Sequence, residues 1–571
     1  MPVEVVMPKL GLTMTEGLIV EWKKKEGDEV KKGDVLFVLE TEKVTYDVEA
    51  PEDGVLGKVL VQEQETVPVG TVVGYLLKPG ESADAIGAAP AAPKAEAAPA
   101  APAASAPKKP AGGKVKLTII GGGTGGYPAA IRAARLGAEV TLIEKDLLGG
   151  VCLNWGCIPT KALLQTAGVI KTMKNSDLFG VSCKGYDINF KTVMDRKSAV
   201  STQLSKGVQG LLGAKKVKVI KGTATLVDNR TVQIAETGEK ITSDAILISI
   251  GSKPIVLPIE GIDSPDVMDS NDVLAMGALP KSAVIIGGGV ISCEFAQILN
   301  SMGCEVTILE LMPTILPGMD KGISSILHKE MEASGIKIFT DAKVKKVQHK
   351  KKGENIVTYE LGGKEQSAKA EKVLATVGRK PALDALNLDA VGIACEKGAI
   401  VVNDRMETNV PCIYAAGDVV GGIMLAHLAT AEAECAAKNI VGQDCVMNYR
   451  VVPSCIYTDP EIASVGLTEE EAKKVADIQV GTFPFRGNGK AMVLGKTEGL
   501  VKVIADKKYG EILGVHIIGP HATDMIAEAV LGMTLEMTTE ELAHAIHPHP
   551  TLTEAIMEAG QTLAGGCIHM P

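Results

Sequence analysis

The amino-acid sequence predicts a multidomain chain, with an all-β sandwich at its N-terminus and a larger α/β part after it. At 571 residues the chain is too long for one hydrophobic core. Apolar and polar positions alternate between glycines over residues 1–78, a pattern typical of short strands. Further along, two glycine-rich turns each lie between a short apolar run and a helical pattern. Such strand–turn–helix units indicate parallel sheets covered by helices.

Residues 1–78 contain a predicted β-hairpin. The segments 35–39 and 44–48 both alternate with period two, and Glu40-Thr41-Glu42-Lys43 lies between them as the tip. Glycines recur through the rest of this region and separate further short strands. We therefore expect a small all-β sandwich.

Residues 79–113 are dominated by alanine, proline and glycine. They contain no apolar periodicity that could form a core, so we expect them to remain mobile. The interspersed prolines predict a semi-rigid extended spacer, with a reach on the order of 100 Å.

The first glycine-rich turn follows a predicted strand at residues 115–120. Gly121 would make the tight turn, Gly123 would let a pyrophosphate approach, and Gly126 would allow the helix to pack on the strand. The helix N-terminus adds amide donors and a positive dipole end. Glu144 ends the next strand and is placed to bond a ribose hydroxyl. These features predict a Rossmann-type dinucleotide site.

The second glycine-rich turn repeats this pattern with the same spacing. Gly287 and Gly289 take the first two glycine positions, Ser292 takes the third, and Glu310 ends the second strand. A carboxylate at the ribose edge would repel a 2′-phosphate, and the next two residues, Leu-Met, carry no cation to bind one. This turn therefore predicts NAD rather than NADP.

Two cysteines, Cys152 and Cys157, lie in a glycine-rich run directly after the first unit. A regular helix would not align them, so a disulfide between them would need a distorted turn and would be readily reduced. Lys161 is near enough to favour the thiolate, which is the reactive form. Two unrelated buried thiols are the alternative. The position beside a cofactor signature favours a redox-active pair.

Composition excludes several other functions. The net charge of −10, without a basic tract, argues against nucleic-acid binding, and no apolar run reaches membrane-spanning length. We expect a cytoplasmic location because no secretory or transit segment is visible. The eleven cysteines are scattered and odd in number, which argues against a disulfide framework. Without CxxC or HExxH motifs, we expect no metal site.

The stretch Gly149–Lys161 closely resembles the active-site motif of the flavin disulfide reductases, and most of all that of their dihydrolipoamide dehydrogenase branch. The resemblance covers roughly residues 114–571. It implies that Cys152 exchanges with the substrate and that Cys157 contacts the flavin. It also implies that the first glycine unit binds FAD and the second binds NAD. Lys161 and Glu294 would form an ion pair beside the flavin.

Other family motifs add further expected site residues. The segment 413–418 resembles the second FAD motif, in which Asp418 would meet the ribityl chain. Gly251 lies in a flavin-proximal segment that lacks the family's usual threonine. Gly378 matches the return from the NAD domain. Near the C-terminus, His549 falls on the catalytic base and Glu554 on the carboxylate that orients it.

The resemblance also implies a division into domains. An FAD-binding domain would cover residues 114–257, an NAD-binding domain 258–380 and a central FAD-binding segment 381–451. An α+β dimerisation domain would cover 452–571. In the family this last domain forms a homodimer, and its histidine reaches the disulfide of the other subunit.

The N-terminal sandwich resembles a lipoyl domain, on the segments 7–11, 26–28 and 40–43. By this resemblance Lys43 carries lipoic acid in amide linkage. Biotinyl domains share the fold, but their target lysine is typically flanked by methionines. Here the neighbours are Glu42 and Val44, which favours lipoic acid.

The implied function is oxidation of protein-bound dihydrolipoyl groups with reduction of NAD⁺. The expected partner is the lipoyl-bearing acyltransferase core of a 2-oxo acid or acetoin dehydrogenase complex. Another disulfide reductase is an alternative, but a glutathione reductase would need cations near Glu310. Mercuric reductases typically carry cysteine motifs at both ends, and this chain has neither. A lipoyl carrier or scaffold subunit is disfavoured by the intact Cys152, Cys157 and His549.

Overall fold

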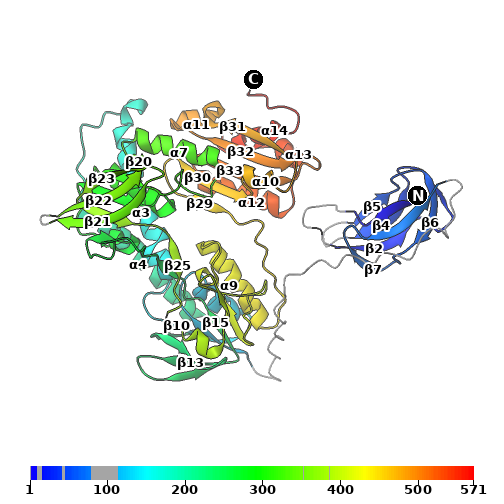
Figure 1. Cartoon of the computed structure of the whole chain (residues 1–571), viewed down its shortest axis with the longest axis horizontal. Helices are drawn as coiled ribbons and strands as arrows, with labels where there is room; N and C mark the ends of the chain where they lie inside the picture. The colour runs from blue at the N-terminus through cyan, green and yellow to red at the C-terminus, as the bar shows by residue number, and fades with distance from the viewer. Residues whose placement is uncertain are drawn as a thin grey trace. The chain divides into compact units, whose positions relative to one another are not determined.

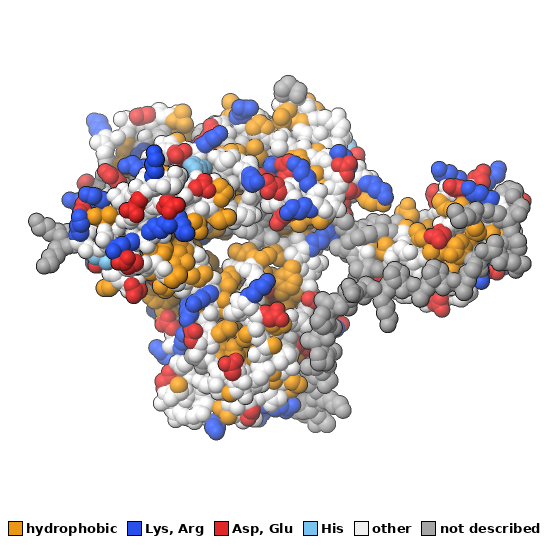
Figure 2. Space-filling model, in the orientation of Figure 1, with side chains coloured by type: hydrophobic (Ala, Val, Ile, Leu, Met, Phe, Trp, Pro, Cys, Tyr) orange, Lys and Arg blue, Asp and Glu red, His pale blue; other side chains and the backbone are white. Residues whose placement is uncertain are grey.

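The computed structural model describes residues 2–8, 14, 16–40, 45–78, 114–350, 353–384 and 386–570. It contains two compact units, Met1–Ala100 and Ala101–Pro571, which are considered separately (Figure 1). Within the described ranges, no helix is long and apolar enough to cross a membrane. On the face of the second unit seen in Figure 2, acidic and basic side chains are interspersed.

The N-terminal unit is a sandwich of two antiparallel four-stranded sheets, as predicted. Apolar side chains from both sheets, including Ile19, Phe37 and Leu56, form its core and are fully buried. The first sheet contains, in spatial order, β1 (Val3–Val6), β8 (Val72–Leu77), β6 (Gly54–Val59) and β3 (Glu29–Val30). The second contains β5 (Thr45–Glu49), β4 (Val35–Glu40), β2 (Glu16–Trp22) and β7 (Glu65–Pro68).

Strands β4 and β5 form the predicted hairpin, with Glu40 paired to Thr45 next to the turn. Phe37 and Leu39 of β4 face the core, whereas Tyr46 on β5 is 52% exposed. Residues 41–43 of the predicted tip, including Lys43, lie outside the described residues, and so do residue 44 and the predicted spacer 79–113.

The second unit begins with a five-stranded parallel sheet. In spatial order it contains β11 (Lys218–Lys221), β10 (Glu139–Glu144), β9 (Lys116–Ile120), β15 (Ala245–Ile248) and β28 (Ile413–Ala415). One face packs on α1 (Gly126–Arg135) and α9 (Ala426–Ile440). The other packs on a small antiparallel sheet of β12 (Ala224–Leu226), β13 (Thr231–Ile234) and β14 (Lys240–Thr242). Alanines on α1 and α9 let these two helices lie close together.

A second five-stranded parallel sheet repeats this architecture. It contains β17 (Val267–Met268), β24 (Lys372–Ala375), β18 (Ser282–Ile286), β19 (Glu305–Leu309) and β20 (Lys337–Phe339). One face packs on α6 (Val290–Ser301) and α7 (Lys321–Ala333). The other packs on an antiparallel sheet of β21 (Lys343–Lys350), β22 (Glu354–Leu361) and β23 (Lys364–Ala370).

The C-terminal part is an antiparallel five-stranded sheet with helices. The sheet order is β29 (Ser454–Ile456), β30 (Glu461–Gly466), β33 (Ile512–Gly519), β32 (Leu500–Asp506) and β31 (Ile478–Pro484). Helices α12 (Ala522–Thr534), α13 (Thr539–His544) and α14 (Glu554–Gln561) share a core with one face of this sheet. Residues Ile456, Ile462 and Ile518 instead join the core around α6 and α7. Every residue of β33 is buried, because both faces of the sheet are covered.

The remaining elements connect these layers. They are α2 (Gly150–Trp155), α3 (Cys157–Lys174), η2 (Ser176–Phe179), α4 (Phe190–Ala214), β16 (Ser252–Pro254), α5 (Ser270–Leu274), β25 (Arg379–Pro381), α8 (Leu388–Val391), β26 (Cys395–Glu396), β27 (Ala399–Ile400), η3 (Asp418–Val420), α10 (Glu469–Ala472), η4 (Phe485–Gly487) and α11 (Gly489–Leu494).

Candidate active site

A cavity of about 1340 Å³ lies within the second unit. Its wall combines the first glycine turn, both cysteines and the N-terminal end of α9. This volume exceeds that of a pocket for a drug-sized molecule and suits an elongated dinucleotide. Backbone at Gly121 and Gly123 lines it, and Glu144 and Asp418 add carboxylates. The residues present therefore fit the predicted flavin cofactor.

The first glycine turn depends on the absence of side chains. Gly121 has φ +102°, and a Cβ there would lie 2.2 Å from the carbonyl oxygen of Ser249. A Cβ on Gly126 would lie 1.8 Å from the carbonyl oxygen of Gly121. Glu144 accepts hydrogen bonds from Gly122 N at 2.6 Å and from Asp146 N at 2.7 Å. The carboxylate is thus fixed at the edge of the cavity, where a ribose hydroxyl would meet it.

The two cysteines lie on either side of a helix break. Cys152 lies in α2, Gly156 leaves the helical conformation, and Cys157 begins α3. Each thiol shifts the pKa of the other. The neighbouring Cys152 lowers the pKa of Cys157 to about 7, against the effect of burial and with help from Lys161. The neighbouring Cys157, together with burial, raises the pKa of Cys152. The reduced pair therefore carries its negative charge on Cys157.

The structure brings Lys161 and Glu294 together at the cavity wall. Lys161 Nζ lies 2.8 Å from each Glu294 carboxylate oxygen, and Glu294 is buried. Tyr457 N donates to Glu294 Oε1 at 2.9 Å, and the Lys161 ammonium lies 4.5 Å from the centre of the Tyr457 ring. The pair links α3, α6 and the segment after β29. A cation is thereby held beside Cys157.

Asp418 belongs to a hydrogen-bonded chain that the sequence did not reveal. Ser252 Oγ donates to Asp418 Oδ2 at 2.5 Å, and Arg379 Nε donates to Ser252 Oγ at 2.8 Å. Burial lowers the pKa of Arg379. Ser252 and Arg379 directly follow the predicted Gly251 and Gly378, so their proximity to those motifs was the available signal. All of these residues except Gly378 line the cavity.

A buried glutamate also supports this wall. Glu432 on α9 accepts from Gly417 N at 2.7 Å and from Tyr449 Oη at 3.0 Å. Burial raises the pKa of Glu432. The glutamate fixes the backbone directly before Asp418. No local sequence pattern marks it, because its partners come from separate segments.

His549 and Glu554 form a hydrogen-bonded pair near the C-terminus. His549 Nδ1 lies 2.8 Å from Glu554 Oε1, and Thr551 N donates to Glu554 Oε2 at 2.7 Å. Burial raises the pKa of Glu554, but Thr551 and His549 outweigh it and the net pKa is low. The His549 side chain is 77% exposed and does not line the cavity of its own chain. The imidazole of His549 is therefore accessible from outside its own chain.

The second glycine turn holds its acidic residue in the same manner. Glu310 is buried and accepts hydrogen bonds from Met312 N at 2.6 Å and from Gly288 N. At the third glycine position, Ser292 Oγ bonds Thr376 Oγ1 at 2.8 Å. Serine therefore replaces the tight packing of glycine with a polar contact. In the described part of the chain, no group of three candidate metal ligands is found.

Comparison with known proteins agrees with this geometry. Residues 115–433 match the family described as pyridine nucleotide-disulphide oxidoreductase, and residues 452–560 match its dimerisation domain. Residues 3–76 match the family described as biotin-requiring enzyme.

Bacterial dihydrolipoyl dehydrogenases match about four fifths of this chain over nearly their whole length. A dihydrolipoyl dehydrogenase of Bacillus subtilis is 41% identical over 458 residues, covering 79% of this chain and 99% of that protein. A dihydrolipoyl dehydrogenase of Geobacillus stearothermophilus is 41% identical over 461 residues, covering 80% of this chain and 98% of that protein. Among solved structures, LpdA of Mycobacterium tuberculosis superposes with a TM-score of 0.73 at 25% identity, covering 79% of this chain and 99% of that one. The HOCl-induced flavoprotein disulfide reductase RclA of Escherichia coli superposes with a TM-score of 0.70 at 29% identity, covering 77% of this chain and 98% of that one.

Proposed function

Because the chain belongs to the pyridine nucleotide-disulphide oxidoreductase family, we propose that it is a dihydrolipoyl dehydrogenase that reduces NAD⁺. It uses FAD and acts as a homodimer through its dimerisation domain. The observation that carries the proposal is the Cys152–Cys157 pair on the wall of a dinucleotide-sized cavity, with Lys161 and Glu294 beside it.

The proposed reaction starts with proton removal. His549 of one subunit takes a proton from a dihydrolipoyl thiol at the other subunit's cysteines, and Glu554 stabilises the resulting imidazolium. The substrate thiolate attacks Sγ of Cys152, which breaks the Cys152–Cys157 disulfide and leaves Cys157 as a thiolate. The second substrate thiol then attacks the mixed disulfide, so that lipoyl disulfide leaves and Cys152 becomes a thiol. Two electrons have then passed to the cysteine pair.

The low pKa of Cys157 and the nearby Lys161 favour the thiolate that this step produces. When bound, FAD supplies the two-electron chemistry that connects the dithiol with NAD⁺. Gly121 and Gly123 would receive its pyrophosphate, Glu144 a ribose hydroxyl and Asp418 the ribityl chain. Gly287, Gly289 and Glu310 would bind NAD, and Glu310 would exclude the 2′-phosphate of NADP.

The N-terminal sandwich adds a carrier function to the same chain. We infer that Lys43 carries lipoic acid, on the basis of the family match over residues 3–76. The partner would be the lipoyl-bearing acyltransferase core of a 2-oxo acid or acetoin dehydrogenase complex, in the cytoplasm. A carrier or scaffold role alone would not require an ordered Lys161–Glu294 pair and an ordered His549–Glu554 pair.

The test is NADH formation from dihydrolipoamide by the FAD-loaded protein. We expect Cys152→Ser to abolish turnover while FAD stays bound, because the glycine turns and Asp418 are unchanged. Cys183→Ser is the matched control, since Cys183 is exposed and does not line the cavity; it should retain activity. Near-normal turnover by Cys152→Ser would overturn the assigned chemistry.

A further inference from the structure

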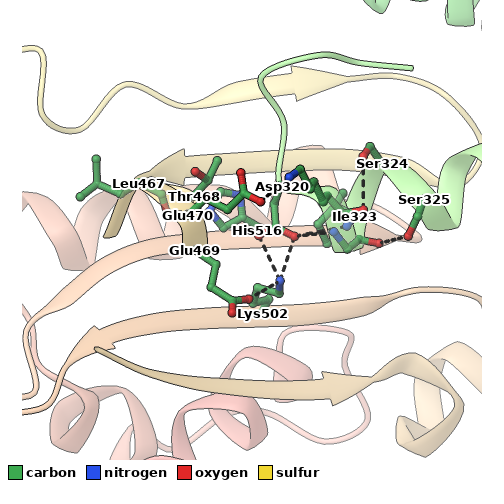
Figure 3. Close-up of polar contacts among 12 residues, drawn as sticks. Asp320, Ile323, Ser324, Ser325, Leu467, Thr468, Glu469, Glu470, Lys502 and His516 are labelled. Atoms are coloured by element: carbon green, nitrogen blue, oxygen red, sulfur yellow. Dashed lines mark hydrogen bonds and ion pairs between the residues drawn. The ribbon is translucent and has the colours of Figure 1, made fainter. Parts of the chain in front are cut away.

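A buried polar cluster joins the second nucleotide-binding part to the C-terminal sheet (Figure 3). Lys502 Nζ on β32 lies 2.8 and 3.0 Å from the two Asp320 carboxylate oxygens, and 3.1 Å from Glu469 Oε2. The side chains of Lys502 and Asp320 are 11% and 4% exposed. None of these residues lines the active-site cavity. A buried charge pair of this kind is costly to break from one side, so it holds its two elements in a fixed relation.

Asp320 is held from its other side by α7. Its Oδ1 accepts hydrogen bonds from Gly322 N at 2.9 Å and from Ile323 N at 3.3 Å, so Asp320 is the N-cap of this helix. His516 lies fully buried in the same cluster and bonds the carbonyl oxygen of Leu467 at 2.9 Å. Asp320 thus joins the start of α7 to the C-terminal sheet.

Asp320 also ends the loop that follows Glu310. Within this loop Leu316 N donates to the carbonyl oxygen of Gly288, in the second glycine turn, at 2.8 Å. Leu316 is buried and has φ +51°, a conformation that a bulky residue adopts only when its surroundings enforce it. Met312, at the start of the loop, donates to the Glu310 carboxylate. The loop therefore supports the glycine turn and the acidic residue together, in a strained form.

We propose that Lys502 is a positioning residue for NAD: from the C-terminal sheet it fixes Asp320, and so holds loop 311–319 against the Gly288 turn. The inference rests on the proposed function in one respect, that this turn binds NAD. Lys502 itself touches neither substrate nor cofactor. Its effect passes through Asp320 and Leu316 to the backbone that receives the nucleotide.

The experiment compares NAD⁺ binding by calorimetry in the oxidised, FAD-loaded wild type and Lys502→Met. We expect the Kd to rise about tenfold, equivalent to ~1.4 kcal/mol. The KM for NAD⁺ should rise in parallel, with kcat and the KM for dihydrolipoamide unchanged. Lys507→Met is the control, because Lys507 follows the same strand but pairs with Asp477 in an exposed ion pair; its Kd should equal that of wild type.

A second variant separates positioning from folding. Asp320→Asn combined with Lys502→Met leaves no carboxylate of the cluster unpaired, because Glu469 keeps its ion pair with Lys473 at 2.6 Å. Asparagine still caps α7. We expect this double variant to fold and still to bind NAD⁺ more weakly than wild type. An unchanged Kd in both variants, whatever their Tm, would overturn the inference. Wild-type turnover of dihydrolipoamide tests the proposed function independently of this comparison.

Discussion

At the scale of single residues, the cysteine pair acts as an asymmetric unit. Cys152 and Lys161 lower the pKa of Cys157 and so stabilise negative charge on it, while Cys157 and burial raise the pKa of Cys152 and keep it protonated. The sequence could predict both cysteines and Lys161, because they lie within one short motif. It could not reveal Ser252, Arg379 or Glu432, because each acts through partners from distant segments. Such contacts exist only once the chain has folded.

This asymmetry predicts a titration in the reduced enzyme. Because the pKa of Cys157 is lowered to about 7, the thiolate should be present above that pH and lost as the pH falls through it. Ultraviolet thiolate absorbance measured against pH checks this midpoint. Lys161→Met should move the midpoint upward, since the nearby cation is gone. A midpoint near that of an ordinary cysteine, about 8.5, would contradict the assignment.

At the scale of elements, the glycine turns are the part of the fold that the sequence predicts best. Strands β9, β10, β18 and β19 and helix α1 lie where the periodicity placed them. The reason is that each turn needs glycine at fixed positions, and that requirement is visible locally. At Ser292, which takes the third glycine position, Thr376 directly after β24 supplies a hydrogen bond. A single sequence offers no means of pairing those two residues.

The turn at α1 gives a prediction at this scale. Gly126→Ala places a methyl group 1.8 Å from the carbonyl oxygen of Gly121, so the helix and strand must separate. We expect a loss of bound FAD and a destabilisation of roughly 1–3 kcal/mol, as for overpacked cores. Gly210→Ala in α4 is the matched control, because its added Cβ meets no atom within 4 Å. It should be neutral or stabilising by about 0.5–1 kcal/mol. Flavin content and Tm measure both effects.

At the scale of the whole molecule, a carrier and the enzyme that would oxidise its cargo share one chain. The match over residues 3–76 supports the carrier, and the tether is the predicted spacer 79–113. Tethering raises effective concentration, to mM levels for short flexible linkers and less for longer ones.

We predict that lipoyl on Lys43 is reduced by NADH through Cys157 and Cys152 at a rate independent of protein concentration. Lys43→Ala should remove this internal reduction and leave turnover of free dihydrolipoamide nearly unchanged. The measurement treats lipoylated protein with NADH at several dilutions and traps the new thiols. If their rate falls in proportion to dilution, the arm works for a partner molecule instead.

The outward position of His549 has a genetic consequence. If each working centre takes its cysteines from one subunit and its histidine from the other, two dead alleles can complement each other. Cys152→Ser and His549→Gln homodimers would both be inactive. A mixed dimer would combine both lesions in one centre and leave the other intact. The two variants can be co-expressed with different affinity tags, and activity should be recovered only in the fraction that carries both tags. A lack of activity in that fraction would show that each subunit supplies its own base.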